Sequence, residues 1–396
     1  MKDIMRFFQQ KMTWLGLIIV IAAISVIGLA QIGSTSNPVP KNMPVAFIQN
    51  DQPFSLPNGQ KLSIGNQIAE KIISQRGEKK PIQWTLLKDK ETAMDELNQM
   101  KYYAVLFIPD QLSQDVASSL SPKPQKAEVT IYINQGKNTT GANLVRQGME
   151  GLTDTMNAAL RAQLLSAIKV QGDQLNTAQA AALSEPITFK LENVNAVPPK
   201  SMNGNAPVAF TILAWFGAIV ASVSLYTASK KATSAAKRSS SGIIAAQSVT
   251  GVIYAMTAAL ITLLLAKWLD LALPDALTFI TYFFIISYCF YCIQSALLNV
   301  LGLSAMPLLI LVFFFGSPIL SLPEEMLPPF TQDWLYSWIP LRFGADVFRD
   351  ILYFGNDMNL ETPLTILITA AAISLGVSLL SAIIPSNRRQ TKTEKI

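Results

Sequence analysis

Histidine is absent from the 396-residue chain, and only two cysteines are present. Without histidine, the chain can form neither a Ser-His-Asp or Cys-His nucleophilic site nor a histidine-ligated metal site. Cys289 and Cys292 lie one helical turn apart in an apolar run, where a reactive thiolate is unfavourable. We interpret them as small buried fillers of a helix; the alternatives are redox chemistry or half of a zinc site.

Charged residues are also scarce, at 14% of the chain against about a quarter in typical soluble domains. Half of the residues are hydrophobic and the mean hydropathy is +0.33, which indicates an integral membrane protein. No G-x-x-x-x-G-K-[ST] phosphate loop occurs, so ATP binding in the P-loop manner is excluded. No nucleophile–base pair or metal-ligand spacing is recognisable. We therefore expect no enzymatic activity, no metal and no cofactor in this chain.

Six apolar stretches reach the length of about 20 residues that a helix needs to cross a bilayer. They are residues 13–32, 206–228, 242–269, 276–298, 303–320 and 363–384. The fourth and fifth belong to one run that is too long for a single span, and we expect it to fold back within residues 299–307. The first is interpreted as an anchor, because it is too long for a cleaved signal.

Charges in the segments between these spans predict their direction. Residues 1–12, 229–241 and 385–396 are basic, whereas residues 321–362 are acidic. With six spans, the three basic segments fall on one side, so we expect both termini in the cytoplasm and the acidic segment outside. The turn between the fourth and fifth spans carries no charge that would indicate its side.

Residues 33–205 have an ordinary polar composition and are expected to form an extracellular domain. Strand patterns alternate with helix patterns, which favours an α/β unit with a mainly parallel sheet. The expected strands are residues 44–50, 82–87, 103–109 and 127–134, and the expected helices are residues 62–75, 90–101 and 110–120. A helical stalk follows, over residues 140–183.

An apolar stripe runs along this stalk at helical spacing. Its members are Val145, Met149, Leu152, Met156, Leu160, Leu164 and Ile168. The stripe could bind an amphipathic ligand or a partner helix, but we favour packing against its own α/β unit or a dimer mate. Basic and acidic residues nearly balance in the domain, so no nucleic-acid partner is indicated.

Prolines and two adjacent glutamates follow the fifth span. We expect residues 318–329 to break that span near the outer leaflet and residues 333–354 to return as a re-entrant or interfacial helix. Aromatic residues Trp334, Tyr336 and Trp338 would then lie at headgroup level. The glutamates are interpreted as part of a solvated loop, in preference to an acid/base or cation site. The candidates for an outer rim or exit path are Gly316, Pro318, Pro323, Glu324, Glu325, Pro328, Trp338, Pro340 and Arg342.

The spans contain no internal charged relay of the kind that proton-driven pumps need. If the chain moves a substrate, we expect the energy to come from a partner. The basic residues of segments 1–12 and 229–241 could receive it, although they could equally be topology signals only. These coupling candidates are Arg6, Lys11, Lys230, Lys231, Lys237 and Arg238.

Two regions carry a family resemblance. In the domain, "VAFIQNDQP", "GQKLSIGNQIAEKI" and "MKYYAVLFIPDQLSQDVASSLSPKPQKAEVTIYINQGKN" are similar in order and spacing to the YhgE/Pip (phage infection protein) branch of the type-2 ABC exporter permeases of Gram-positive bacteria. "FGSPILSLPEEMLPPF" and "WLYSWIPLRFGADVFRDILYFGN" resemble the terminal block of that branch. The chain departs from the branch in having a short stalk where members often carry a long coiled-coil insertion.

The resemblance implies a multi-pass protein of a Gram-positive plasma membrane, in contact with lipid and forming a homodimer or heterodimer. A separate cytosolic P-loop ATPase would hold ATP, and hydrophobic or amphipathic compounds would leave along the subunit interface. The alternative is a non-transporting surface protein, either a phage-adsorption receptor or an envelope or secretion scaffold, that uses the α/β domain as a binding module.

Overall fold

The computed structural model describes residues 40–56, 61–74, 80–171, 175–236, 241–355 and 361–382. The predicted first span, residues 13–32, and the terminal segments 1–12 and 385–396 lie outside the described residues. The chain divides into two compact units. An α/β unit comprises Val39–Pro198, and a helical unit contains the described residues from Pro199 onward.

A five-stranded sheet with the order β4-β1-β5-β6-β7 forms the centre of the α/β unit. Its strands are β1 (Met43–Gln49), β4 (Ile82–Leu87), β5 (Ala104–Ile108), β6 (Glu128–Asn134) and β7 (Thr188–Val194). β1 pairs in parallel with β4 and β5, and β6 pairs in parallel with β7; β5 and β6 are antiparallel. The prediction of a mainly parallel sheet is confirmed. β7 and a small hairpin, β2 (Phe54–Ser55) with β3 (Lys61–Leu62), were not predicted.

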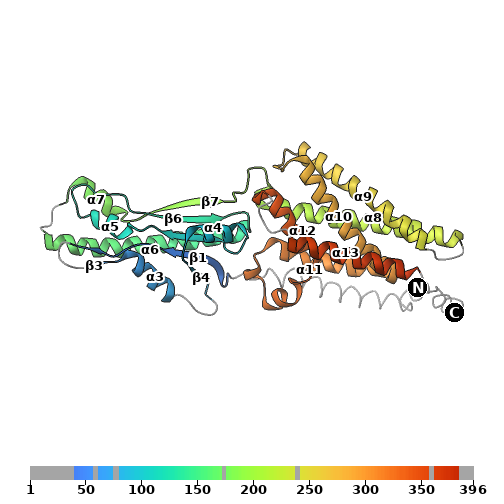
Figure 1. The fold of residues 1–396 in the computed structure, drawn as a ribbon, viewed down its shortest axis with the longest axis horizontal. Helices are drawn as coiled ribbons and strands as arrows, with labels where there is room; N and C mark the ends of the chain where they lie inside the picture. The colour runs from blue at the N-terminus through green and yellow to red at the C-terminus, as the bar shows by residue number, and fades with distance from the viewer. Residues whose placement is uncertain are drawn as a thin grey trace, which may run out of the picture. The chain divides into compact units, whose positions relative to one another are not determined.

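Helices cover both faces of this sheet. They are α3 (Ile64–Ser74), α4 (Lys90–Asn98), α5 (Leu112–Ser118), α6 (Thr139–Gln171) and α7 (Thr177–Ser184). On one face, Ala93 and Leu97 of α4 pack with Ala46, Ile48 and Val105 of the sheet. On the other face, the long helix α6 runs lengthwise along the sheet (Figure 1).

The apolar stripe of α6 is buried within the chain. Leu152 is half-buried, and the other six members are exposed by 7% or less: Val145, Met149, Met156, Leu160, Leu164 and Ile168. The expected packing of the stripe against its own α/β unit is therefore confirmed.

The buried Asp51, just after β1, joins two helices to the sheet. Its carboxylate accepts hydrogen bonds from the Gly65 N–H (2.8 Å), the Ser113 N–H (2.7 Å) and the Ser113 hydroxyl (2.6 Å). A Cβ on Gly65 would lie 2.6 Å from the Asp51 Cβ, so glycine permits this approach. Because Gly65 and Ser113 lie in the first turns of α3 and α5, the carboxylate also satisfies backbone donors that a helix leaves unpaired.

The helical unit contains four runs that are long and apolar enough to cross a membrane: Ala206–Ser234, Ser241–Trp268, Ala276–Ser321 and Thr362–Ser381. They form α8 (Ala206–Ala236), α9 (Ser241–Trp268), α10 (Ala276–Leu301), α11 (Met306–Ser321) and α13 (Glu361–Ser381). The third run is divided at Gly302, whose φ of 69° is unfavourable for other residues.

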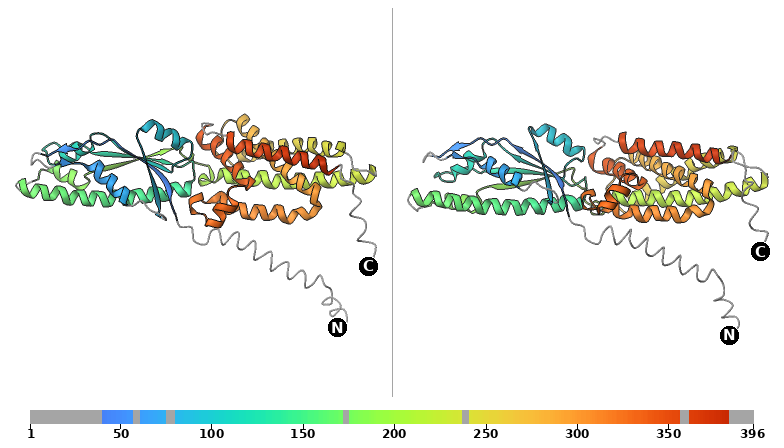
Figure 2. Two further views of the ribbon diagram at one scale, coloured as in Figure 1. Left: turned by 60° about the horizontal axis from the view of Figure 1, so that its bottom comes forward. Right: turned by 90° about the horizontal axis from the view of Figure 1, so that it is seen from below.

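Side-chain contacts give the direction of α10 and α11 relative to α8. The ring centroids of Phe210 and Phe279 are 4.9 Å apart, and Leu298 packs with Tyr226 further along both helices, so α10 runs parallel to α8. Met306 packs against the cluster that contains Tyr226 and Leu298, whereas the ring centroids of Phe313 and Phe216 are 4.7 Å apart, so α11 runs the opposite way (Figure 2). The chain therefore folds back between α10 and α11.

α10 lies among α8, α9 and α13 and provides much of the helical core. Cys289 and Cys292 are free and buried in it, as predicted. Tyr291 packs directly over Gly251 of α9, and its hydroxyl donates to the Gln247 carbonyl at 2.8 Å. Gln294, which the sequence analysis did not single out, is fully buried and donates to the Trp215 carbonyl at 3.2 Å. Interhelical hydrogen bonds of this kind join spans where no water is available.

Candidate functional site

α11 ends inside the segment, residues 318–329, that was predicted to break the fifth span. Pro318, the first residue of that segment, lies buried inside α11, which continues to Ser321. The Leu322 N–H donates to the Pro318 carbonyl at 3.2 Å, so helical hydrogen bonding continues past the proline. The helix ends at Leu322, which is extended before Pro323, as residues preceding proline favour. The predicted break is therefore present, at residues 322–323, and the helix does not end at Pro318 itself.

Gly316 lies on the buried side of α11. A Cβ on Gly316 would be 3.2 Å from Ile339 Cγ2 and 3.5 Å from Leu341 Cδ1. The absence of a side chain thus lets the segment around residue 340 approach the α11 backbone closely. Of the predicted rim candidates, this residue makes the clearest packing contribution.

The segment that carries the two glutamates packs against the helical core. Glu324 and Glu325 are half-buried in a short 3₁₀ turn, Glu324–Met326, and Pro323 beside them is buried. Met326 and Leu327 are exposed by 7% and 5%, and Leu327 belongs to the helical core. Burial of these two apolar side chains holds the turn against the helices, and the solvation of the glutamates stays a prediction. Pro328, the next candidate, is half-buried.

Helix α12 (Pro340–Arg349) is packed among the candidate spans. Pro340 is in its first turn, where a missing N–H has no cost. A Cβ on Gly344 would lie 3.0 Å from Phe290 of α10 and 3.4 Å from Thr211 of α8. The Phe348 ring lies 5.8 Å from that of Phe210. The returning helix that the sequence predicts is present, and most of its surface is buried; its depth in a membrane stays a prediction.

A charged cluster forms around α12. Arg342 lies 3.8 Å from the ring centre of Tyr336 and donates to the Tyr336 carbonyl at 3.0 Å. Arg349 bonds Asp346 at 2.7 Å and the Leu320 carbonyl, at the end of α11, at 3.0 Å. Arg342 approaches the same Asp346 carboxylate at 3.7 Å. Burial, with the nearby Asp346 carboxylate as a second cause, raises the pKa of Tyr336 and keeps it neutral. The cluster therefore joins α12 to α11 through the hydrogen bond from Arg349 to the Leu320 carbonyl.

Only Arg342 of this cluster was among the predicted candidates. Asp346 and Arg349 fall within residues 321–362, which were interpreted only as an acidic segment on the outer side. Their spacing of three residues is a helical ion-pair signal that could have identified the pair. The hydrogen bond from Arg349 to the Leu320 carbonyl joins residues far apart in the sequence, so no local sequence pattern predicts it.

Two tryptophans are exposed beside the cluster. Trp334 and Trp338 are exposed by 69% and 53%, and the Trp338 indole donates to the Trp334 carbonyl at 2.6 Å. Exposed aromatic side chains with a polar tip are typical of membrane interfaces. Tyr336 differs from them, because it is half-buried against Arg342.

The predicted coupling candidates are described only in part. Lys230 and Lys231 are exposed near the end of α8, which is helical to Ala236, and the Lys230 ammonium lies 5.4 Å from the ring centre of Tyr226. The other four candidates lie outside the described residues: Arg6, Lys11, Lys237 and Arg238.

Comparisons with known proteins give a family match and two distant relatives. The model of a family described as "ABC-2 family transporter protein" matches residues 11–382. The chain is 23% identical over 126 residues to the "Uncharacterized protein YhgE" of Bacillus subtilis (strain 168), covering 32% of this chain and 16% of that protein. It is 23% identical over 135 residues to the "ESX secretion system protein YueB" of the same strain, covering 34% and 12%. The alignments thus span less than a fifth of either relative. No solved structure matches.

Proposed function

Because the chain belongs to the ABC-2 family of transporter proteins, we propose that it is the permease subunit of an exporter for hydrophobic or amphipathic compounds. Membership confirms the family resemblance found in the sequence, and it makes the chain a membrane transport component without catalytic machinery of its own. A separate P-loop ATPase would supply the energy, and two permease chains, identical or different, would form the path. We place it in the plasma membrane of a Gram-positive bacterium, with six spans and both termini inside.

The observation that carries the proposal is the family match over residues 11–382. The charge distribution supports it. The run Ala276–Ser321 and the run Thr362–Ser381 contain no charged residue, and the other two runs contain lysines only near their ends. Proton-driven pumps and transporters use chains of ionisable groups within the membrane as relays. A permease that receives its energy from a partner subunit needs no ionisable group within its own spans.

The test is purification of the full chain from its own host, followed by identification of any P-loop subunit that co-purifies. Replacing Lys230, Lys231, Lys237 and Arg238 with glutamine should reduce ATP hydrolysis by the complex. Replacing Lys392 and Lys395 with glutamine is the control, since it also removes basic residues from a segment expected in the cytoplasm. The proposal is refuted if two results occur together. The purified complex contains no ATPase, and deletion of the gene leaves the host's export of hydrophobic and amphipathic compounds unchanged.

The alternative is a surface protein that binds a phage or an envelope partner through the α/β unit. Two observations favour keeping it: the α/β unit is a compact unit with its own core, and one relative is named as a secretion system protein. Expression of residues 1–200 alone separates the two functions. If that anchored fragment restores phage sensitivity or partner binding, the spans serve only as an anchor.

A further inference from the structure

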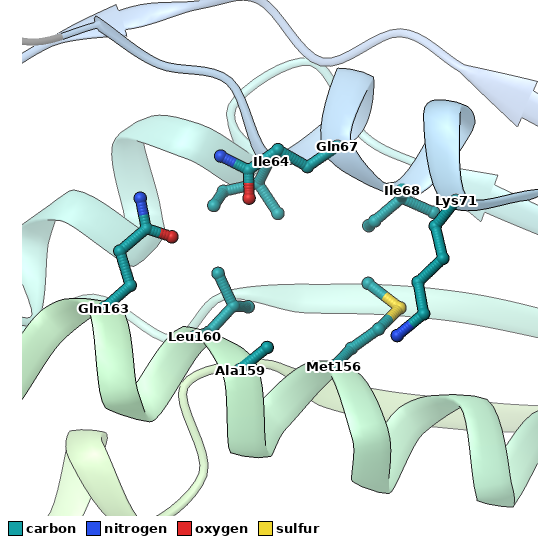
Figure 3. A pocket seen from close by; sticks show the side chains of 8 residues that line it. All are labelled: Ile64, Gln67, Ile68, Lys71, Met156, Ala159, Leu160 and Gln163. Atoms are coloured by element: carbon teal, nitrogen blue, oxygen red, sulfur yellow. The ribbon is translucent and has the colours of Figure 1, made fainter.

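Left-handed backbone gathers in the tether, residues 195–205, that joins β7 to α8. Lys200, Met202 and Asn203 have φ values of 65°, 58° and 55°, and Gly204 follows at 85°. This conformation is unfavourable for L-residues, although asparagine tolerates it better than lysine or methionine does. The hollow between α3 and α6 (Figure 3), by contrast, is lined by residues of two regular helices, and none of them has a positive φ. Backbone strain is therefore a feature of the tether.

Met202, Asn203 and Gly204 form a short left-handed turn. The Gly204 N–H and the Ala206 N–H both donate to the Ser201 carbonyl, at 3.1 Å and 3.2 Å. L-residues visit the left-handed region singly and rarely in succession. The side chains of Met202 and Asn203 are exposed, so their burial does not hold the turn. The turn therefore depends on the contacts at its ends.

Lys200, which precedes the turn, is joined to the end of α9. Its ammonium pairs with the Asp270 carboxylate, and its carbonyl accepts the Ala272 N–H at 3.0 Å. Asp270 is left-handed as well, with a φ of 56°, at the position after a helix where glycine is usual. Glycine at either position would remove the cost of the left-handed backbone, but it would also remove the charge. Two strained residues thus hold each other through their side chains.

This pair contributes little to stability. The Lys200 and Asp270 side chains are exposed by 63% and 76%, so water and salt screen their attraction. The cost of a left-handed backbone at each residue is at least as large as the gain from an exposed pair. A contact that is strained and only weakly held opens readily, and strain of this kind is typical of segments that switch.

We propose that Lys200 and Asp270 form a releasable latch on the tether between the α/β unit and α8. The closed latch holds the left-handed turn, in which Ser201 and Ala206 are in contact. When the latch opens, the strained residues relax, and five residues can extend to about 16 Å, which lengthens the tether by roughly 10 Å. Because salt screens the pair, rising ionic strength opens the latch. A surface-binding protein could use it as well as a transporter could, so it is tested separately from transport.

Hydrogen exchange of the full chain in phosphatidylcholine nanodiscs, measured by mass spectrometry, tests the latch. Peptides over residues 201–206 should exchange about two- to fivefold faster in about 500 mM than in about 20 mM sodium chloride. Lys200→Gln and Asp270→Asn should each exchange at the faster rate in both salts. The control Lys267→Gln, at an exposed lysine near Asp270, should keep the salt response. If both latch variants exchange as the unmodified chain does, the proposal is wrong.

A further variant separates a strained latch from an ordinary surface ion pair. Met202→Gly relieves the left-handed turn without touching the pair, and Met202 is 47% exposed, so little packing is lost. In the Asp270→Asn background it should slow exchange of residues 201–206 about tenfold. Peptides of α10 should exchange alike in all variants, which shows that the chains are folded. If Met202→Gly leaves exchange unchanged in that background, strain does not drive the opening and the latch is refuted.

Discussion

The contact between Gly251 of α9 and Tyr291 of α10 allows a sharp prediction. A Cβ on Gly251 would lie 2.1 Å from Tyr291 Cε1, whereas carbon atoms pack at about 3.5–4.0 Å. The methyl group of Gly251→Ala would therefore overlap the ring by roughly 1.4 Å or more. Tyr291 is exposed by only 1%, so the ring cannot turn into solvent and the two helices must separate.

The expected cost follows from two contributions. Inserting atoms into a packed core costs about 1–3 kcal/mol. Separation of the helices would also break the 2.8 Å hydrogen bond from the Tyr291 hydroxyl to the Gln247 carbonyl, which is worth about 1 kcal/mol. The total of about 2–4 kcal/mol corresponds to a fall in melting temperature of roughly 4–16 °C for a unit of this size.

Thermal unfolding of the purified chain in detergent measures this fall. Gly217→Ala is the matched control, because its Cβ would meet only Ala258 Cβ at 3.9 Å and should leave the melting temperature unchanged. Adding Gly251→Ala to a Tyr291→Leu background should cost much less than in the unmodified chain, since the clashing ring is gone. A Gly251→Ala chain that melts as high as the unmodified one would refute the described packing of α9 on α10.

Three further predictions concern charged residues. Asp51→Ala should destabilise the α/β unit by about 2–4 kcal/mol, because it leaves three buried donors unpaired, and limited proteolysis should then cut that unit first. Arg349→Ala should cost about 1–3 kcal/mol by removing the pair with Asp346, which a lower melting temperature of the helical unit would show; an unchanged value would contradict it. Burial and then two nearby carboxylates raise the pKa of Asp115, so its ionisation opposes folding and this contribution to stability falls as pH rises through the carboxyl range. Asp115→Asn should therefore raise the melting temperature at pH 7 but not below that range.

Much of the α/β unit could be predicted because its signals are local. β1, β4, β5 and β6 are apolar runs bounded by polar residues, and the helices between them have regular apolar spacing. β7 lacked such a signal, because this edge strand carries the charged pair Lys190 and Glu192 and is mostly not buried. Its place in the sheet depends on pairing with β6, and that pairing is not encoded in its own composition.

The candidate site shows the same division between local and distant signals. Gly316, Pro340 and Arg342 were recognised because glycine, proline and an isolated charge are unusual beside a span. Pro318, at the start of the predicted break, stays within α11, and the helix ends only before Pro323. The bond from Arg349 to the Leu320 carbonyl joins separate helices, so it follows only from the packed structure.

The connection between β6 and β7 also bears on how such proteins can change in length. These neighbouring parallel strands are joined through α6 and α7, while their register is held by seven paired residues. Closing a longer loop adds little entropic cost, about 0.6 kcal/mol for each doubling. Extra helical turns could therefore accumulate between α6 and α7 during evolution without moving the sheet. The sheet of the α/β unit would then keep its structure while the helical extension varies in length. The connection between α6 and α7 is for the same reason a suitable place to insert a reporter domain.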